Sequence, residues 1–315
     1  MKALMYHYIR EYNDSLRNLK FLHIQDFKKQ LDYLGAEYGF VSQKNFLEFI
    51  KGNIPVPKGV VLTFDDGLKD HYKYVFPELK RLGLWGVFYI SSGIFEQKKL
   101  LSVHAVHFLL AKYGSISVLN KLEVSGILDE VLFKEVSQAH DNKIYLHQKI
   151  SKEEYIIKRL LNYSLDAQRK EEVCSYLIKA FDENDKELHK NTYLTQTEIK
   201  EMNDAGMIMG SHAVSHQPML ELTDNNSEKE ITESFNFFKS LLDPKILTFC
   251  YPHGLPHTFG LREIHYLESL NIDFSFAVES RDITSEDQQK NIHSLPRYDC
   301  NEFKYGKAYN ANPTP

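Results

Sequence analysis

The sequence has few cysteines, no long hydrophobic run and no excess of positive charge. Its three cysteines, Cys174, Cys250 and Cys300, are widely spaced and form no Cys-x-x-Cys pair. This use of cysteine does not predict a disulfide framework and is typical of thiols that stay reduced in a cytosol. No run reaches the ~18 apolar residues of a membrane-spanning helix, so the sequence predicts no transmembrane segment.

The N-terminal residues also lack the pattern of a signal peptide. Lys2 is followed by only seven apolar or aromatic-rich residues, 3–9, before the charged Arg10 and Glu11. This run is too short for the apolar region of an export signal, and charged residues follow it too closely. It predicts a buried strand instead. We therefore expect a cytoplasmic protein, with peripheral contact with the inner membrane left open.

The charge balance is slightly acidic. The chain has 38 Lys and Arg against 43 Asp and Glu, a net charge of -5. Nucleic-acid-binding proteins usually carry a basic face, so we expect no nucleic-acid partner. Hydrophobic residues make up 43% and charged residues 26% of the chain, which is ordinary for a globular protein and argues against wholesale disorder.

Short apolar runs alternate with helical stretches, which predicts an α/β protein with parallel strands. Apolar residues at steps of three and four predict an amphipathic helix over 24–38. A second helix is expected over 70–82, divided or kinked at Pro77 and ended by Gly83. Seven strands, which would nearly close a barrel, are expected at 3–9, 60–64, 85–91, 207–210, 246–251, 274–278 and 292–297.

The middle of the chain has a different composition. Residues 96–196 contain no Pro and only two Gly, with many Leu, Lys and Glu at helical spacing, so they predict a helical insertion. The barrel would then be discontinuous, built from 1–95 and 197–300. The tail 301–315 is rich in Asn, Tyr and Pro, and we expect it to pack loosely.

Two adjacent carboxylates, Asp65 and Asp66, follow the apolar run 60–64. Like charges side by side are costly unless a cation or separate hydrogen-bond partners keep both ionised. Two imidazoles four residues apart, His212 and His216, follow another expected strand. Two His and one Asp leave coordination positions open for water and substrate, so the pattern indicates a catalytic metal site.

The histidine spacing is weak evidence by itself, because His253 and His257 repeat it. The two motifs together are specific: Thr63-Phe64-Asp65-Asp66-Gly67 with Ser211-His212-Ala213-Val214-Ser215-His216 resembles the first two motifs of the polysaccharide deacetylase family. This family is also called the NodB-homology group or carbohydrate esterase family 4. The resemblance covers about residues 1–95 and 195–300. It implies a distorted (β/α) barrel of seven strands, in agreement with the strand count above.

The resemblance implies that Asp66, His212 and His216 bind a divalent metal and that Asp65 is the general base. A divalent ion lowers the pKa of its bound water from ~15.7 toward ~7, within reach of a carboxylate base. Zinc is the default for this ligand set, with cobalt, nickel and manganese left open. The alternative for Asp65 is to orient a histidine ligand.

A third family motif, usually Arg-x-Pro-Tyr-Gly, corresponds here to Cys250-Tyr251-Pro252-His253-Gly254. Cys250 stands where Arg is common, and His253 stands where Tyr is common. The resemblance implies an oxyanion site at the backbone N–H of His253, and we expect Tyr251 and Pro252 to belong to the same substrate-facing segment.

Two terminal motifs resemble those of a subgroup of the family. Leu295-Pro296-Arg297 resembles its Leu-Pro-Arg motif, and we expect Arg297 to replace the missing Arg that orients Asp65; an ordinary surface ion pair is the alternative. Leu4-Met5-Tyr6-His7 resembles its N-terminal motif, and the first and last strands of a barrel are neighbours. We therefore expect His7 to be the general acid, with His293 and His253 as other candidates and a buried structural histidine as the alternative.

Together the residues and the resemblance predict a metal-dependent hydrolase that acts on a carbohydrate and removes an N-acetyl group from an amino sugar. A nucleotide- or lipid-linked precursor of surface polysaccharide, such as lipopolysaccharide or capsule, would fit a cytoplasmic enzyme. Two alternatives stay open. One is a deformylase or another linear or cyclic amidase with the same metal site, and the other is a non-catalytic carbohydrate-binding relative.

Overall fold

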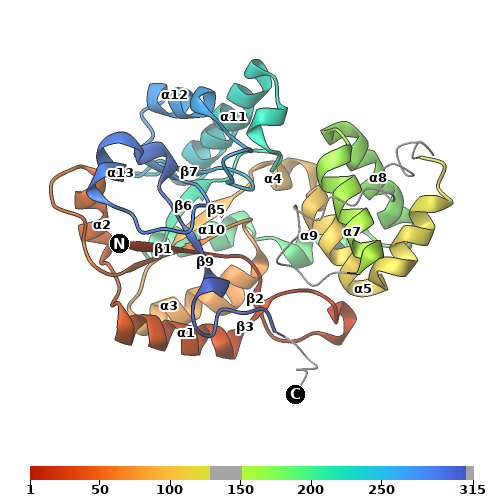
Figure 1. Ribbon diagram of the computed structural model, residues 1–315, viewed down its shortest axis with the longest axis horizontal. Coiled ribbons are helices and arrows are strands. Elements are labelled where there is room, and N and C mark those ends of the chain that lie inside the picture. The colour runs from red at the N-terminus through yellow and green to blue at the C-terminus, as the bar shows by residue number, and fades with distance from the viewer. Residues whose placement is uncertain (128–150, 310–315) are drawn as a thin grey trace. The chain divides into compact units, whose positions relative to one another are not determined.

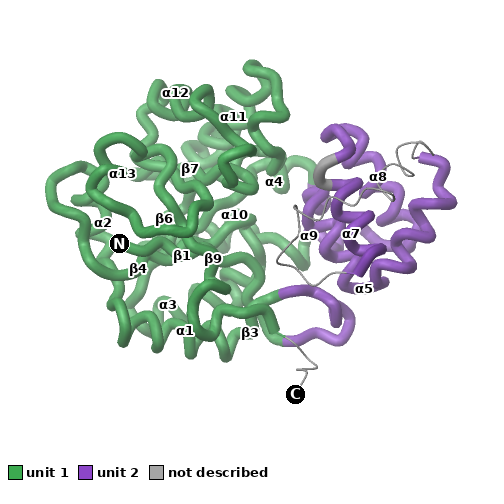
Figure 2. The backbone as a smooth tube through the Cα atoms, in the orientation of Figure 1, with its two compact units in different colours: residues 1–11, 21–97, 190–315 green, residues 12–20, 98–189 purple. Residues whose placement is uncertain are grey.

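The computed structural model describes residues 1–127 and 151–309. It divides into two compact units (Figure 2). The first unit comprises Met1–Glu11, Phe21–Gln97 and Lys190–Pro315, and the second comprises Tyr12–Lys20 and Lys98–His189. None of the helices in the described residues is long and apolar enough to cross a bilayer.

A curled sheet of 7 parallel strands forms the centre of the first unit, with the order β8-β7-β6-β5-β4-β1-β9 (Figure 1). This arrangement confirms the predicted α/β fold class with a seven-stranded, barrel-like sheet. Its strands are β1 (Lys2–Tyr6), β4 (Val60–Phe64), β5 (Val87–Ile90), β6 (Ile208–Ser211), β7 (Thr248–Cys250), β8 (Phe274–Phe276) and β9 (Tyr298–Asp299). Strands β2 (Ile9–Arg10) and β3 (Leu22–His23) form a separate pair.

The predicted strand over 292–297 is wrong. Its first residues form the 3-10 turn η5 (Ile292–Ser294), and β9 begins only at Tyr298, beyond Pro296. Proline has no N–H to donate to a sheet, so regular pairing starts after it. Leu295 still forms an isolated parallel bridge with Phe276 of β8. The segment that leads into β9 therefore contacts both edges of the sheet.

The first predicted strand also ends earlier than expected. The extended run divides into β1 and β2, and His7 and Tyr8 lie between the two strands. Helix α1 (Ile24–Glu37) matches the predicted amphipathic helix and buries Ile24, Phe27 and Leu31.

The expected helix over 70–82 is divided as Pro77 predicts. A π-helical turn, η2 (His71–Val75), precedes α3 (Phe76–Leu82), and Pro77 occupies the first turn of α3, where its missing N–H costs nothing. The helix ends at Gly83, whose φ of 64° is the left-handed cap that glycine adopts most readily.

Helices α1 and α11 pack on the same, outer face of the curled sheet. Phe27 of α1 contacts Phe64 of β4, and Phe235 of α11 contacts Phe249 of β7. The strands β4, β5 and β6 are buried along their whole length, as expected for parallel strands with helices on one face and a barrel interior filled by side chains on the other. Further helices of the first unit are α2 (Gln43–Ile50), α4 (Gly93–Gln97), α10 (Gln196–Asp204), α11 (Asp224–Leu242), α12 (Leu261–Ser269), α13 (Ser285–Lys290), η4 (Met219–Glu221) and η6 (Cys300–Glu302).

The described residues of the second unit are helical. Helix α5 (Ser102–Glu123) packs against α7 (Lys152–Arg159) and α8 (Ala167–Ala180). Gly114, with a φ of 78°, interrupts α5. The unit also contains η1 (Asp14–Leu16), η3 (Leu160–Ser164) and the first residues of α9 (Asp185–Thr192). Residues 128–150 of the expected insertion lie outside the described part of the chain.

The tail is anchored at two points within the described residues. Gly306 is buried, and a Cβ at this position would collide with the carbonyl of Cys300. The backbone N–H of Tyr309 donates to the carbonyl oxygen of Phe21 at 2.7 Å, and the two rings stack with centroids 5.4 Å apart. Residues 310–315 are not described.

Gly210 in β6 gives a test of how closely the sheet packs beside the histidine motif. A Cβ at Gly210 would lie 2.5 Å from Cε1 of Tyr89 and 2.8 Å from Cγ2 of Thr248. We predict that Gly210→Ala lowers the free energy of unfolding by about 1–3 kcal/mol, because these side chains must shift. Urea unfolding measures the change.

Gly35 of α1 supplies the matched control. Its Cβ would meet only the edge of the Phe40 ring, at 3.2 Å, and alanine favours a helix over glycine. Gly35→Ala is therefore expected to leave the protein as stable as before, or more stable. An unchanged urea midpoint for Gly210→Ala would contradict the close packing.

Candidate metal and catalytic site

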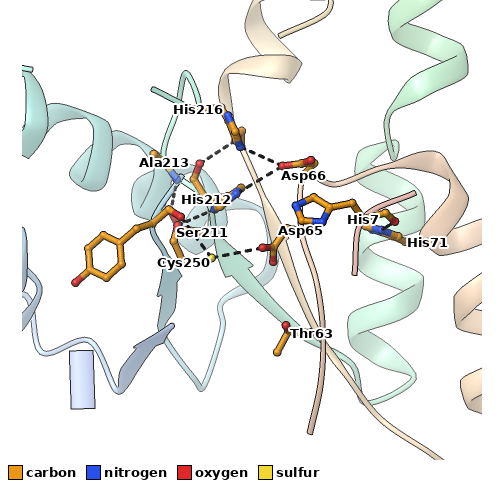
Figure 3. Close-up of polar contacts among 12 residues, drawn as sticks. His7, Thr63, Asp65, Asp66, His71, Ser211, His212, Ala213, His216 and Cys250 are labelled. Atoms are coloured by element: carbon orange, nitrogen blue, oxygen red, sulfur yellow. Dashed lines mark hydrogen bonds and ion pairs between the residues drawn. The ribbon is translucent and has the colours of Figure 1, made fainter. Parts of the chain in front are cut away.

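The motif residues meet at one edge of the sheet (Figure 3). Asp65 and Asp66 follow the last residue of β4, His212 follows the last residue of β6, and Tyr251 follows β7. Because these strands run parallel, their carboxyl ends lie at the same edge, where open α/β sheets bind ligands. The fold thus brings together motifs that are far apart in the sequence.

Asp66, His212 and His216 point their polar atoms at one another. Oδ1 of Asp66 lies 3.6 Å from Nε2 of His212 and 3.2 Å from Nε2 of His216. The two imidazole centroids are 4.9 Å apart. Ligand atoms that share one ion at about 2.0–2.2 Å are separated by distances of this size. These three residues could hold a metal ion.

The protonation of His212 decides what this cluster can bind. Its Nδ1 lies 2.7 Å from the carbonyl oxygen of Cys250, and a carbonyl oxygen can only accept, so Nδ1 carries the proton. Burial and the neighbouring His216 lower the pKa of His212 to about 4, despite the opposing carboxylates. At neutral pH its Nε2 therefore presents a lone pair to Asp66. Lone pairs and a carboxylate oxygen directed at one point suit a cation, so the donor set fits a divalent metal.

Asp65 has a different partner. Its two carboxylate oxygens accept hydrogen bonds from Nη1 and Nη2 of Arg297, each at 2.8 Å. Both side chains are buried, Arg297 at 1% and Asp65 at 2% exposure. Burial alone would raise the pKa of Asp65, but the charge and hydrogen bonds of Arg297, together with the nearby His212, outweigh burial and lower the pKa. Asp65 is therefore ionised at neutral pH.

Cys250 adjoins this ion pair. Nη2 of Arg297 lies 2.9 Å from its Sγ, and Nη1 also donates to Oγ1 of Thr63 at 3.0 Å. The structure therefore places a guanidinium from residue 297 beside the position where an arginine is common in the third motif. The contact lies in the protein interior, unlike an ordinary surface ion pair.

His7 lies beside Asp65 and Asp66 in Figure 3, and its charge contributes to the lowered pKa of Asp65. Its backbone is fixed by His71, whose Nε2 lies 2.9 Å from the His7 carbonyl oxygen. His253 lies beside His216, with the two ring centroids 5.1 Å apart. Both residues are close enough to the cluster to act on a substrate there.

Two other residues considered for the site, His293 and Tyr251, are buried in the core. His293 is buried beside Ser275, with Nδ1 3.4 Å from its Oγ, and the carboxylates that act on its pKa are Glu268 and Asp273, outside the cluster. Tyr251 is fully buried, and its hydroxyl donates to the carbonyl oxygen of His293 at 2.7 Å.

The three residues expected to face the substrate, Tyr251, Pro252 and His253, lie in different surroundings. The backbone N–H of Tyr251 points to the carbonyl oxygen of Phe276 at 3.5 Å, so both donors of Tyr251 are used inside the protein. Pro252 is buried and has no N–H. His253 is exposed and has a φ of 62°. Of the three residues expected to face the substrate, His253 is the one that reaches the surface of the cluster.

Sequence reasoning did not find Glu230. This residue of α11 accepts hydrogen bonds from the backbone N–H groups of Val214 and Ser215, both at 2.8 Å, and from the Ser215 hydroxyl at 2.6 Å. In the sequence Glu230 is one of several acidic residues of a polar helix, so no local signal marks it. The partly buried ion pair of Arg10 with Asp70, at 2.7 Å and 2.9 Å, was also missed.

Solved structures with the same fold include three deacetylases. The Streptococcus pyogenes deacetylase PplD in complex with acetate has a TM-score of 0.57 at 16% identity, over 94% of this chain and 90% of that one. The polysaccharide deacetylase BC0361 from Bacillus cereus has a TM-score of 0.51 at 15% identity, over 94% and 63% of the two chains. The BpsB deacetylase domain from Bordetella bronchiseptica has a TM-score of 0.50 at 11% identity, over 94% of each.

At these identities the structural likeness shows a common fold. No match was found among curated proteins. The model of the polysaccharide deacetylase family matches residues 168–269. The matched segment carries the histidine motif, and the fold brings that motif against the carboxylates that follow β4. This part of the chain is therefore similar to the polysaccharide deacetylase family.

Proposed function

We propose that this protein is a metal-dependent hydrolase that removes an N-acetyl group from an amino sugar. The observation that carries the proposal is the convergence of Asp66, His212 and His216 beside a second carboxylate, Asp65, with its own buried counter-charge. A structural metal site would fill its coordination with protein ligands, whereas three ligands leave room for substrate and water.

Asp66, His212 and His216 would hold the ion. A divalent metal bound there supplies Lewis acidity, which polarises an amide carbonyl and lowers the pKa of water. Zinc is the ion that we propose, because it is commonly bound by neutral imidazoles together with a carboxylate. The hydrogen bond from Nδ1 of His212 to Cys250 fixes the tautomer and the orientation that this role requires.

Asp65 is the proposed general base. The fork of Arg297 holds its carboxylate in one orientation and keeps it ionised. Each carboxylate oxygen has a further lone pair that can accept a proton from a water molecule attacking the acetyl carbon. Thr63 and Cys250 hold Arg297 in turn, so the base is supported by a second layer of contacts.

His7 is the proposed proton donor to the substrate, and the backbone of His253 is the proposed hydrogen-bond donor. We propose that the His7 ring, beside the two carboxylates, protonates the amine as it leaves. The backbone N–H of His253 would stabilise the developing oxyanion. Their neighbours differ, because His7 lies by Asp65 and His253 lies by His216, and this supports the division of roles.

For the substrate we propose a nucleotide- or lipid-linked amino sugar in the cytoplasm, a precursor of surface polysaccharide such as lipopolysaccharide or capsule. The state of the cysteines supports a reducing compartment, since all three are free and Cys174 and Cys250 are buried.

Asp65→Asn and His216→Ala test the metal and base assignments. Asp65→Asn keeps the three ligands, so it should retain the metal and lose about 10²–10⁴-fold in hydrolysis rate, the range for removal of a general base. His216→Ala removes a ligand and should lose metal and activity together. Metal analysis and acetate release on the same preparations measure both. A wild-type rate of hydrolysis by Asp65→Asn would show that Asp65 is not the general base.

The variant Arg297→Gln tests, through the pH dependence of kcat/KM, whether Arg297 lowers the pKa of Asp65. Without the guanidinium, burial is left to raise the pKa of Asp65, so the base becomes protonated at a higher pH. The acid limb of the kcat/KM profile should then move to higher pH, with a loss of up to about 10²-fold near neutrality.

Arg297→Lys is the control, because lysine keeps the charge but not the two-pronged contact. We expect it to shift the limb less than Arg297→Gln. Thermal unfolding of both variants checks that the fold survives the loss of a buried partner. An acid limb at the wild-type position in Arg297→Gln would contradict the role of Arg297.

A product assay separates deacetylation from deformylation. Metal-loaded protein is incubated with N-acetyl and N-formyl amino sugars on nucleotide and lipid carriers, and released acetate and formate are quantified. We expect acetate, because residues 168–269 match the polysaccharide deacetylase family. Formate as the main product would favour the deformylase alternative, and neither product, despite bound metal, would favour a binding protein.

A further inference from the structure

The loop between His212 and His216 has a strained backbone. Ala213 has a φ of 61° and His216 a φ of 60°. Residues other than glycine seldom adopt this left-handed region, because their side chains make it sterically unfavourable. The strain places the ring of His216 against Asp66, so contacts from outside the loop must hold it.

The segment after β5 supplies one set of contacts. The backbone N–H groups of Ser92 and Gly93 donate to the carbonyl oxygens of Ala213 and Val214, both at 3.0 Å. A Cβ on Gly93 would lie 2.6 Å from the carbonyl oxygen of Val214. Glycine is therefore required for this close approach, which fixes the carbonyl side of the loop.

Helix α11 supplies the opposite set. Oε2 of Glu230 accepts from the N–H groups of Val214 and Ser215, and Oε1 accepts from the Ser215 hydroxyl. One turn further along α11, the hydroxyl of Ser234 bonds to that of Ser211, which in turn accepts from the N–H of Ala213 at 3.2 Å. One face of α11 thus contacts both ends of the loop.

We propose that Glu230 is a positioning residue for the metal site, and that its carboxylate holds His212 and His216 in the orientation that binds the ion. The inference rests on the proposed metal site. No other side chain within the loop could do this, because Ala213 and Val214 have no polar group, and the Ser215 hydroxyl is itself bound to Glu230. Without Glu230 the two N–H groups would lose their acceptor, and the strained loop could relax.

The chemistry of the contact predicts which substitutions are tolerated. Glutamine keeps an acceptor oxygen for the two N–H groups, and its amide can donate to the Ser215 hydroxyl, which is able to accept. Glu230→Gln should therefore preserve the loop, and Glu230→Ala should not. Removal of a residue that orients metal ligands typically weakens metal binding by about 10–100-fold.

Zinc affinity is the quantity to measure, by competition with a chromophoric chelator on metal-free protein. Glu230→Ala should raise the Kd for zinc by about 10–100-fold, and Glu230→Gln should stay near wild type. Glu233→Ala is the matched control, because Glu233 is exposed on the same helix. Gly93→Ala perturbs the loop from the other side and should also weaken zinc binding. Circular dichroism checks that each variant is folded.

The outcomes separate this inference from the proposed function. If the wild-type protein does not bind zinc or another divalent ion at one per chain, the metal site itself fails. If the wild type binds and Glu230→Ala binds as tightly, Glu230 does not position the ligands. If Glu230→Gln is as weak as Glu230→Ala, the charge of Glu230 rather than its hydrogen bonds is responsible, and the positioning role is overturned.

Discussion

Two consecutive buried carboxylates are the constraint on which the site depends. Asp65 and Asp66 are only 2% and 5% exposed, and an ionised carboxylate in the interior costs several kcal/mol unless a positive charge accompanies it. Asp65 has Arg297, while Asp66 faces imidazoles, one of which, His212, is neutral at neutral pH. The structure thus gives one carboxylate a protein cation and leaves the other directed at two imidazoles. We propose that this difference separates a base from a ligand in two residues of the same type.

The closure of the sheet supplies the counter-charge of Asp65. Leu295 bridges to Phe276 of β8, and Tyr298 pairs with Leu4 of β1, so the residues between them cross from one edge of the sheet to the other. Arg297 lies in that crossing and extends inward to Asp65. A guanidinium placed there can reach a carboxylate that follows β4, because β4 is the next strand after β1. Small Cys250 lies directly against this guanidinium. The same few residues therefore join the sheet edges and neutralise Asp65.

Much of this arrangement could be predicted from local sequence patterns. An apolar run followed by polar residues marks the end of a parallel strand, so Asp65, Asp66 and His212 could be expected at one edge of the sheet. The last strand could not, because Pro296 interrupts a pattern that otherwise alternates like a strand. Glu230 could not either, since it bonds to backbone N–H groups, which every residue except proline carries. Arg297 was expected only because the chain resembles a known subgroup and lacks the usual arginine at Cys250.

The strain at the site shows how its parts depend on one another. Asp66, Ala213, His216 and His253 all have positive φ, whereas the described chain has only five other such residues apart from glycine. In a structural metal site the ion provides the free energy that folds its ligands. Here the polar backbone groups of Ala213, Val214 and Ser215 are largely satisfied by Ser92, Gly93, Ser211 and Glu230. Hydrogen bonds from the protein therefore stabilise the strained loop before any ion binds, and an ion bound there would not be needed to fold it. The remaining coordination positions of the ion would stay available for water and substrate, as catalysis requires.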